Sequence, residues 1–418
     1  MQAERAGATL AGMTRTVAET RGGTSVLVAG GGVAALETAL ALRALGPGRV
    51  RVELVAPELH FFYRPLAVAE PFGVGRVHRW ELDDLVRAAG ADFVPGELVA
   101  VDPDARVAEL KNGLRIGYDA IVLATGARPE VAVRGALTFR GPADVEAIQR
   151  LLAEITGGEA TKIVFAVPSG VVWPLPLYEL ALLTATELER REVDVSLTIA
   201  TSEPAPLALF GATASAAVEA ALSELGIDVQ TSTYPVEFAD GLLTSARDDP
   251  LAADRVVALP RLTGPDLRGI PRDQRGFVTT DEHGRVRGLR DVYAAGDLTA
   301  FPIKQGGLAA QQADAAAETI AAQAGVPLEP RPFSPVLRAL LLTGKAPVFL
   351  RVELGGGHGE TSTAADEPLW WPPGKIVGRY LAPFLAELGV LDISPEPDED
   401  VLRVELDAAG AHMLGWPR

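Results

Sequence analysis

The chain has 418 residues, of which 48% are hydrophobic and 22% charged, so it holds enough apolar material for two or three globular domains. Its formal net charge of −17 at pH 7 disfavours nucleic acid and anionic lipid head groups as main partners, because both would be repelled. The absence of cysteine excludes a redox disulfide, a thiolate metal site and a cysteinyl-flavin bond.

The N-terminal residues 1–23 contain three arginines among small residues and lack the compact apolar stretch of a secretory signal, so we expect a disordered tail. No window of about 20 apolar residues occurs anywhere, so no transmembrane helix is expected. The default location is therefore cytoplasmic.

A βαβ unit is predicted directly after this tail. Residues 25–29 form a short apolar run that is typical of a buried parallel strand. Residues 33–45 follow with helical periodicity, and residues 49–55 predict the next strand. This order and length are those of a βαβ motif.

The turn inside this unit reads Gly30-x-Gly32-x-x-Ala35. Gly30 permits the tight turn, Gly32 lets the backbone approach a pyrophosphate, and Ala35 still allows close packing of helix and strand. The N-terminus of the helix offers unpaired N–H groups to phosphates. We therefore predict a dinucleotide site here rather than a purely structural turn. The site would also include Gly31, Val33 and Ala34.

An acidic residue should follow about 20 residues later, where it would hold ribose hydroxyls. Ala56 and Pro57 stand at that place, between Glu53 and Glu58. Glu53 lies within the predicted strand, so Glu58 is the better candidate. A solvated loop charge at Glu58 remains the open alternative.

Further strands and helices follow in alternation. A buried strand at 119–124 ends in Ala124-Thr125-Gly126. A second βα block is expected to contain strands at 162–167, 193–200, 226–230 and 255–259 and a helix at about 177–191. The strand at 291–295 leads into Gly296-Asp297 and a long alanine-rich helix at about 307–324.

The segment Tyr293-Ala294-Ala295-Gly296-Asp297, together with the glycine turn and Ala124-Thr125-Gly126, resembles the two-dinucleotide-binding-domain flavoproteins, which are pyridine nucleotide-disulfide oxidoreductase-like. The three motifs occur in the order found in that family. The resemblance implies noncovalent FAD, with Asp297 on its ribityl chain. A helix N-cap is the open alternative for Asp297.

Two more segments are similar to the branch that contains sulfide:quinone oxidoreductases and type II NADH dehydrogenases. The run His60–Leu66, with Tyr63, Arg64 and Pro65, resembles an aromatic Arg-Pro loop of that branch. The run from Pro302 through Lys304, Gln305 and Gly306 is similar to the segment that covers the isoalloxazine. Of the paired glutamines typical of type II NADH dehydrogenases, the second corresponds to Gln311 or Gln312, and Gly307 replaces the first.

Lys304 is one of only five lysines. A cation beside the N1/O2 edge of a flavin would stabilise the anionic reduced form. A surface lysine without a catalytic role is the alternative.

The second block lacks the glycine fingerprint that a nicotinamide dinucleotide site should carry. Bulky residues and three prolines fill residues 166–179, and proline removes N–H donors. The length of this loop resembles the sulfide:quinone oxidoreductase and flavocytochrome c sulfide dehydrogenase branch, in which it carries a catalytic cysteine. Trp173 stands near that position, so the thiol chemistry is absent. Trp173 would either wall the space beside the flavin or belong to a domain-interface core.

The C-terminal part includes Trp370-Trp371 and the apolar run to Leu385, after a glycine-rich turn at 355–357. Paired tryptophans with basic residues fit a peripheral membrane contact. A homodimer interface or a cap on the flavin domain is the preferred reading, because the helix is short and the protein acidic. The five histidines, which include His358 and His412, lack ligand spacing, so no metal is expected.

The expected fold is α/β, with two Rossmann-like dinucleotide-binding domains plus a C-terminal region. We expect an FAD-binding domain built from 24–150 and 265–330, an inserted second Rossmann-like domain at 151–264, and the C-terminal region at 331–418.

The expected function is that of an FAD-dependent oxidoreductase with a small-molecule electron donor and acceptor, a quinone being one candidate acceptor. Lys304, Trp173 and Tyr63 would take part in catalysis, with Trp173 and Tyr63 lining the substrate side. An NAD(P)H-dependent reductase with a divergent nicotinamide site is one alternative. A non-catalytic flavin-binding or protein-interaction module is the other.

Overall fold

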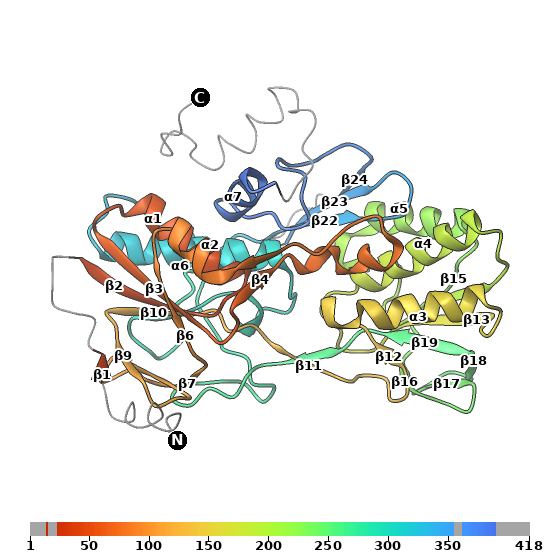
Figure 1. Ribbon diagram of the computed structural model, residues 1–418, viewed down its shortest axis with the longest axis horizontal. Coiled ribbons are helices and arrows are strands. Elements are labelled where there is room, and N and C mark those ends of the chain that lie inside the picture. The colour runs from red at the N-terminus through yellow and green to blue at the C-terminus, as the bar shows by residue number, and fades with distance from the viewer. Residues whose placement is uncertain (1–13, 16–22, 355–361, 390–418) are drawn as a thin grey trace, which may run out of the picture.

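The computed structural model describes residues 14–15, 23–354 and 362–389. Two parallel sheets lie side by side, and a small antiparallel sheet with one short helix lies across one side of both (Figure 1). The fold is α/β, as predicted. None of the helices in the described ranges combines the length and the apolar character needed to cross a membrane.

The first sheet has five parallel strands in the order β21-β10-β2-β3-β6. Alternate residues of its central strand β2 enter different cores, Val26 and Val28 on one face and Leu27 and Ala29 on the other. Both faces are therefore covered, as parallel strands require. The strands are β2 (Thr24–Ala29), β3 (Val50–Ala56), β6 (Asp92–Pro95), β10 (Ala120–Leu123) and β21 (Val292–Ala294).

Helices α1 (Val33–Leu45) and α6 (Gly306–Gln323) cover one face of this sheet and pack on each other. Their contact is lined by small side chains such as Ala35, Ala39 and Ala313, which let the helices approach closely. The shorter α2 (Leu82–Ala88) lies on the same side (Figure 1). The other face packs against an antiparallel meander of β7 (Leu98–Asp102), β8 (Val107–Leu110) and β9 (Arg115–Gly117).

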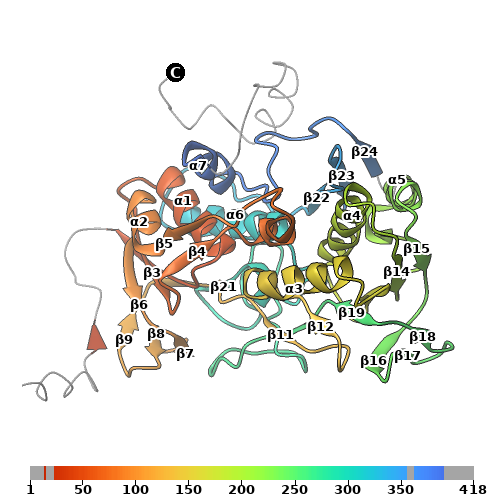
Figure 2. The same cartoon turned by 45° about the vertical axis from the view of Figure 1, so that its right-hand side comes forward.

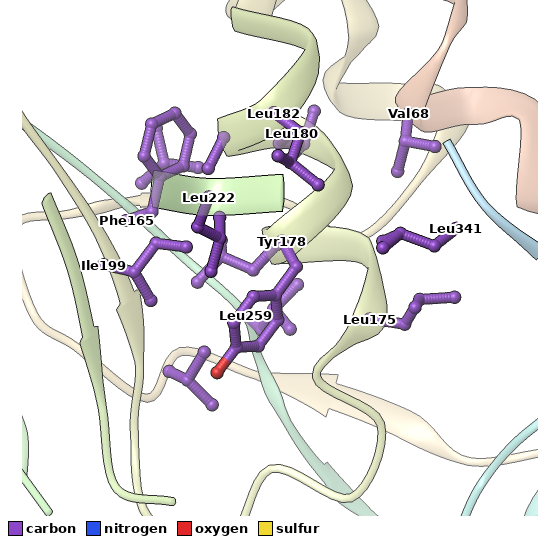
Figure 3. Close-up of a cluster of buried hydrophobic side chains, with 14 of the residues drawn as sticks. Val68, Phe165, Leu175, Tyr178, Leu180, Leu182, Ile199, Leu222, Leu259 and Leu341 are labelled. Carbon is purple, nitrogen blue, oxygen red and sulfur yellow. The ribbon is translucent and has the colours of Figure 1, made fainter. Parts of the chain in front are cut away.

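The second sheet is also parallel, in the order β12-β19-β13-β14-β15. Its core is dense, and Figure 3 shows Phe165, Tyr178 and Ile199 among the side chains gathered between helix and sheet. Its strands are β12 (Leu137–Thr138), β13 (Lys162–Val167), β14 (Ser196–Thr201), β15 (Asp228–Gln230) and β19 (Arg255–Ala258), and its helices are α3 (Val145–Thr156), α4 (Leu175–Arg190) and α5 (Ala212–Glu224).

The chain crosses between the two sheets on an antiparallel pair, β11 (Arg128–Glu130) and β20 (Arg261–Thr263). After this return, β21 joins β10 in the first sheet. The first sheet is thus assembled from two stretches of sequence separated by the second. The exact domain boundaries stay a prediction.

The C-terminal sheet consists of β22 (Val336–Leu341), β23 (Val348–Glu353) and β24 (Ser362–Ala365), followed by α7 (Leu381–Glu387). The second parallel sheet and its helices α3, α4 and α5 are called the second body below. Leu337, Leu341 and Leu350 of the C-terminal sheet enter the core of this second body. Leu381 and Leu385 of α7 enter the core around α1 instead. The expected glycine turn at 355–357 and the histidines His358 and His412 lie outside the described residues.

The remaining elements are short. Within the expected N-terminal tail, β1 (Thr14–Arg15) pairs in parallel with β9, which corrects that expectation for these two residues. Residues 1–13 and 16–22 lie outside the description. The others are β4 (His60–Phe62), β5 (Arg79–Glu81), β16 (Pro235–Ala239), β17 (Leu242–Ser245), β18 (Leu251–Ala252) and the 3₁₀ turns η1 (Arg64–Val68), η2 (Glu70–Phe72), η3 (Pro142–Asp144), η4 (Ala208–Phe210) and η5 (Gly296–Leu298).

Candidate functional site

The glycine turn between β2 and α1 is shaped by close backbone packing. Gly30 has φ +139°, and a Cβ added there would stand 2.1 Å from the carbonyl oxygen of Ala124. Only glycine fits that contact. A Cβ on Gly32, by contrast, would meet nothing within 4 Å, so the space above it is open.

Helix α1 begins at this open space without a side-chain cap and without an acidic residue in its first turn. Its first N–H groups therefore have no side-chain acceptor among the described residues, and the helix dipole is uncompensated. This arrangement fits a pyrophosphate.

Glu58 lies beside the same turn. A Cβ on Gly31 would stand 3.7 Å from Oε2 of Glu58 and 3.1 Å from Cβ of Ala56. Glu58 is exposed, whereas Glu53 is buried within β3. Of the two carboxylates considered from the sequence, only Glu58 is thus placed where a ribose could reach it.

The η5 turn carries Asp297 into a cavity between the two sheets. Gln312 of α6 fixes this turn, because its Oε1 accepts hydrogen bonds from the N–H of Gly296 (2.7 Å) and the hydroxyl of Thr299 (3.2 Å). Asp297 does not cap α6, whose N-cap is Gln305, so the N-cap alternative is wrong. Burial raises the pKa of Asp297 against the lowering effect of Lys304 and Arg64.

Lys304 is buried, with 6% of its surface exposed, so the surface-lysine alternative is wrong. Its ammonium group donates to the carbonyl oxygens of Thr299 and, at 2.7 Å, Phe301. It also lies 4.1 Å from the ring centroid of Phe277. Burial lowers the pKa of Lys304 to about 8, and the nearby carboxylate of Asp297 opposes that shift.

The cavity has a volume of about 300 Å³ and brings together residues that are far apart in the sequence. Its lining includes the charged residues Arg64, Asp297 and Lys304 and the apolar residues Trp173 and Leu340. Of the other residues expected at the cofactor, Pro65, Gln305 and Gly306 also line it.

Tyr63 does not line the cavity, contrary to the expectation that it faces the substrate. It is 2% exposed, and its hydroxyl accepts a hydrogen bond from the N–H of Ile376 at 3.1 Å. Burial raises its pKa to about 12. Arg64 and Pro65 of the same loop line the cavity, whereas the tyrosine packs against the C-terminal segment.

Trp173 takes part both in the lining of the cavity and in a hydrophobic core. It lines the cavity, and its ring packs on Phe210 in the core of the second body, with centroids 5.9 Å apart. The core of the second body therefore supports the part of the cavity wall that Trp173 forms.

The sequence did not reveal a buried ion pair in the same wall. Lys375 of the C-terminal segment binds Oε1 of Glu179 from α4, and both side chains line the cavity. The same Oε1 accepts the N–H of Leu342 at 2.9 Å. Burial raises the pKa of Glu179 and lowers that of Lys375, and the opposite charge of each counteracts both shifts. Glu179 stands within the divergent 166–179 loop-and-helix segment, but no pattern linked it to position 375.

The turn between β13 and α4, where a second dinucleotide would be expected, lacks the features of a phosphate-binding turn. Helix α4 starts after Pro174 and has a further proline in its first turn, Pro176. The acidic residue after the second strand of this block, Glu203, accepts a hydrogen bond from the hydroxyl of Tyr178 at 2.7 Å. In a Rossmann site that carboxylate would hold ribose hydroxyls.

The glutamines of α6 have structural partners. Gln311 donates to the carbonyl of Val336 and accepts from its N–H, both at 2.9 Å, and so ties α6 to β22. Gln312 holds the η5 turn. Neither glutamine lines the cavity.

Comparison with known proteins agrees with this geometry. A family model described as pyridine nucleotide-disulphide oxidoreductase matches residues 24–317. An NADH dehydrogenase-like protein of Mycobacterium tuberculosis is 27% identical over 308 residues, which cover 66% of this chain and 73% of that protein. The ferredoxin reductase component of chlorobenzene dioxygenase from a Cupriavidus species is 30% identical over 303 residues, covering 68% and 69%.

The sulfide-quinone reductase of Aquifex aeolicus is 29% identical over 187 residues, which cover 43% of each chain. The solved structure of the sulfide:quinone oxidoreductase from this bacterium superposes with a TM-score of 0.76 at 20% identity, covering 92% of this chain and 95% of that one. The matched family model spans most of the chain and includes both sheets. The chain therefore belongs to the pyridine nucleotide-disulphide oxidoreductase family and is an FAD-dependent oxidoreductase.

Proposed function

We propose that this oxidoreductase passes electrons to a small, flat organic acceptor of the quinone type, which binds in the part of the cavity next to Trp173, beside the flavin ring that Lys304 would contact. The observation that carries this proposal is the cavity itself, whose lining combines several charged side chains with a larger number of apolar ones. Such a site suits a ligand with an apolar ring body and a few polar atoms. The electron donor is a small molecule whose oxidation needs no thiol of this chain, because the sequence has no cysteine.

The cofactor residues belong to the same proposal. FAD, when bound, supplies the electron transfer, and the chain supplies position and charge. Gly30, Gly32 and the N-terminus of α1 would hold the pyrophosphate, Glu58 the ribose and Asp297 the ribityl chain. Lys304 would place its positive charge at the ring.

The ion pair between Glu179 and Lys375 gives this wall of the cavity a proton donor. A quinone needs protons as well as electrons when it is reduced. In this ion pair the proton lies on the Lys375 ammonium group, which Glu179 holds in place, and burial lowers the pKa of Lys375 and so makes it a better acid. We propose that this pair delivers protons to the acceptor.

A reductase that uses NADH or NADPH is the second candidate. It is favoured by the relatives named NADH dehydrogenase-like protein and ferredoxin reductase component. It is disfavoured by the prolines at the start of α4 and by the hydrogen bond that occupies Glu203. We therefore expect no tight nicotinamide site at that turn.

Anaerobic titration of the purified, FAD-loaded protein separates these candidates. We expect menadione to reoxidise the dithionite-reduced protein rapidly, whereas NADH leaves the flavin absorbance unchanged over minutes. Rapid bleaching by NADH would support the second candidate instead. Protein that turns over no donor–acceptor pair would favour a non-catalytic module. The homodimer, the cytoplasmic location and the peripheral membrane contact stay predictions.

A further inference from the structure

The C-terminal segment 374–382 is held by three separate parts of the molecule. Lys375 binds Glu179 on α4, and the N–H of Ile376 donates to the hydroxyl of Tyr63. The N–H groups of Tyr380 and Leu381 both donate to Glu37 on α1. Both views place α7, which begins in this segment, beside α1 (Figure 2). The segment therefore links the cavity to the helices of the first sheet.

Glu37 is the centre of this attachment. It is fully buried in α1, and its two oxygens accept the N–H of Tyr380 at 2.8 Å and that of Leu381 at 2.7 Å. A Cβ on Gly378 would stand only 2.5 Å from its Oε2, so the segment lies directly on the carboxyl group. No other residue type fits at position 378 without a shift of the segment.

A second carboxyl group, that of Asp314 on α6, neighbours Glu37, and each of the two influences the pKa of the other. Its Oδ1 has no hydrogen-bond partner within the described ranges. Two carboxylates in contact in a buried place cannot both be ionised at low cost, so the pair retains a proton. Burial raises the pKa of Glu37 to about 7 and that of Asp314 well above its usual range.

The charged groups that face this pair balance it only while one proton is present. Glu318 on α6 binds Arg379 of the segment at 3.0 Å and also Arg331, and hydrogen bonds and charge from these arginines outweigh burial and keep the pKa of Glu318 low. Tyr380 stays neutral because burial raises its pKa. With one shared proton, two negative and two positive charges remain. Loss of that proton leaves one uncompensated negative charge in the interior.

We propose that Glu37 and Asp314 form a proton-operated clasp for the C-terminal segment. With a shared proton, the segment is held on α1 and α6, and Lys375 is held at Glu179 in the cavity wall. When the pair loses its proton, the segment detaches and the cavity opens at that wall.

The sign of the pH dependence follows from linkage. The attached state binds more protons than the detached state, because only attachment buries the carboxyl groups and raises their pKa values. Attachment therefore weakens as pH rises above about 7. For one bound proton, the attachment equilibrium changes by up to about tenfold per pH unit.

Hydrogen exchange of the FAD-loaded protein tests the clasp directly. The amides of Tyr380 and Leu381 would be followed by mass spectrometry between about pH 6.5 and 9, with rates divided by those of an unstructured peptide at the same pH. We expect their protection to fall by about tenfold or more over this range. Asp314→Asn should abolish this fall, because the amide N–H of asparagine donates to Glu37 at every pH. Asp84→Asn, on the exposed surface of α2, is the matched control and should keep the wild-type dependence.

Two outcomes would overturn the clasp. One is wild-type protection that does not change with pH, and the other is an Asp314→Asn variant that keeps the wild-type slope. If Asp314→Asn does not fold, Glu37→Gln replaces it, with low protection expected at all pH values because one acceptor for the segment is lost. Protection in Glu37→Gln that still falls with pH would contradict the proposal. Exchange does not depend on turnover, so failure here is distinct from failure of the quinone proposal.

Discussion

Lys304 shows how burial changes the meaning of a residue. Its sequence context resembled a flavin-covering segment, and an exposed surface lysine was the alternative. The structure buries the ammonium group against two carbonyl oxygens and the ring of Phe277, a few residues from Asp297. Its positive charge is thus fixed in position, with little water to screen it.

We predict that Lys304→Met lowers the midpoint potential of bound FAD. The lost interaction with a reduced, anionic flavin resembles a hydrogen bond to a charged group, about 1.5–3 kcal/mol, which for two electrons is roughly 30–65 mV. Anaerobic spectroelectrochemical titration at pH 7 measures the change. Because burial lowers the pKa of Lys304 to about 8, wild type should approach the variant as pH rises beyond that value.

Lys345→Met is the control for this measurement, because Lys345 is half exposed and pairs with Glu224 at the surface. Its potential should match wild type at every pH. A Lys304→Met potential equal to wild type would show that the ammonium group does not face the flavin ring.

The elements of the first sheet were predictable because their signals are local. The apolar run at 25–29, the glycine turn and the helix at 33–45 are contiguous, and β2, α1 and β3 form within two residues of the expected positions. The same holds for β10 and β21, whose ends carry the other two motifs. Local propensity and the tertiary fold agree throughout this region.

The attachments of the C-terminal segment were not predictable from such signals. Glu37 meets Leu381 across 344 positions, and Glu179 meets Lys375 across 196. Each of these residues alone reads as an ordinary helical or loop charge. Only the folded structure shows that each of them is buried against its partner, and this is why the Glu179–Lys375 part of the cavity wall was not predictable from the sequence.

The turn before α1 gives a prediction about backbone space. Gly30→Ala should abolish FAD retention, because the new Cβ would overlap the carbonyl oxygen of Ala124 and the backbone has φ +139°. The absorbance ratio of flavin to protein after purification measures retention. Gly48→Ala is the control. It also has a positive φ, +74°, but its added Cβ meets nothing within 4 Å, so it should bind FAD normally.

Helix α6 and strand β22 give a second prediction at the level of whole elements. Gln311→Leu should lower the free energy of unfolding by about 2–3 kcal/mol, because it leaves the N–H and the carbonyl of Val336 without their partner. Denaturant titration of the FAD-loaded protein measures the loss. Gln149→Leu, at an exposed position of α3, should cost less than about 0.5 kcal/mol. Equal effects of the two substitutions would contradict the tie between α6 and β22.

The molecule as a whole is two sheet-based bodies joined by thin connections, β11 and β20, and bridged a second time by the C-terminal region (Figure 1). The core of the second body includes Val68 from the first-sheet stretches and Leu341 from the C-terminal sheet (Figure 3). Leu308, from the other first-sheet stretch, belongs to the same core. The cavity lies where these parts meet, so its shape depends on contacts that cross between them. One of these contacts is the ion pair between Glu179 of the second body and Lys375 of the C-terminal segment, whose side chains are both buried.

This pair leads to a prediction in which stability and activity separate. Glu179→Leu or Lys375→Met alone should lower the free energy of unfolding by about 3–5 kcal/mol, because each leaves a buried charge without its counter-charge. The double variant should regain most of that stability, since an apolar pair avoids the cost of burying charge. A double-mutant cycle from denaturant titrations measures the coupling.

Quinone reduction by the double variant should nevertheless stay well below wild type, because the proton donor at the cavity wall is gone. Additive losses in the cycle would mean that the two side chains do not act as a pair. Wild-type turnover in the double variant would mean that protons reach the acceptor by another route.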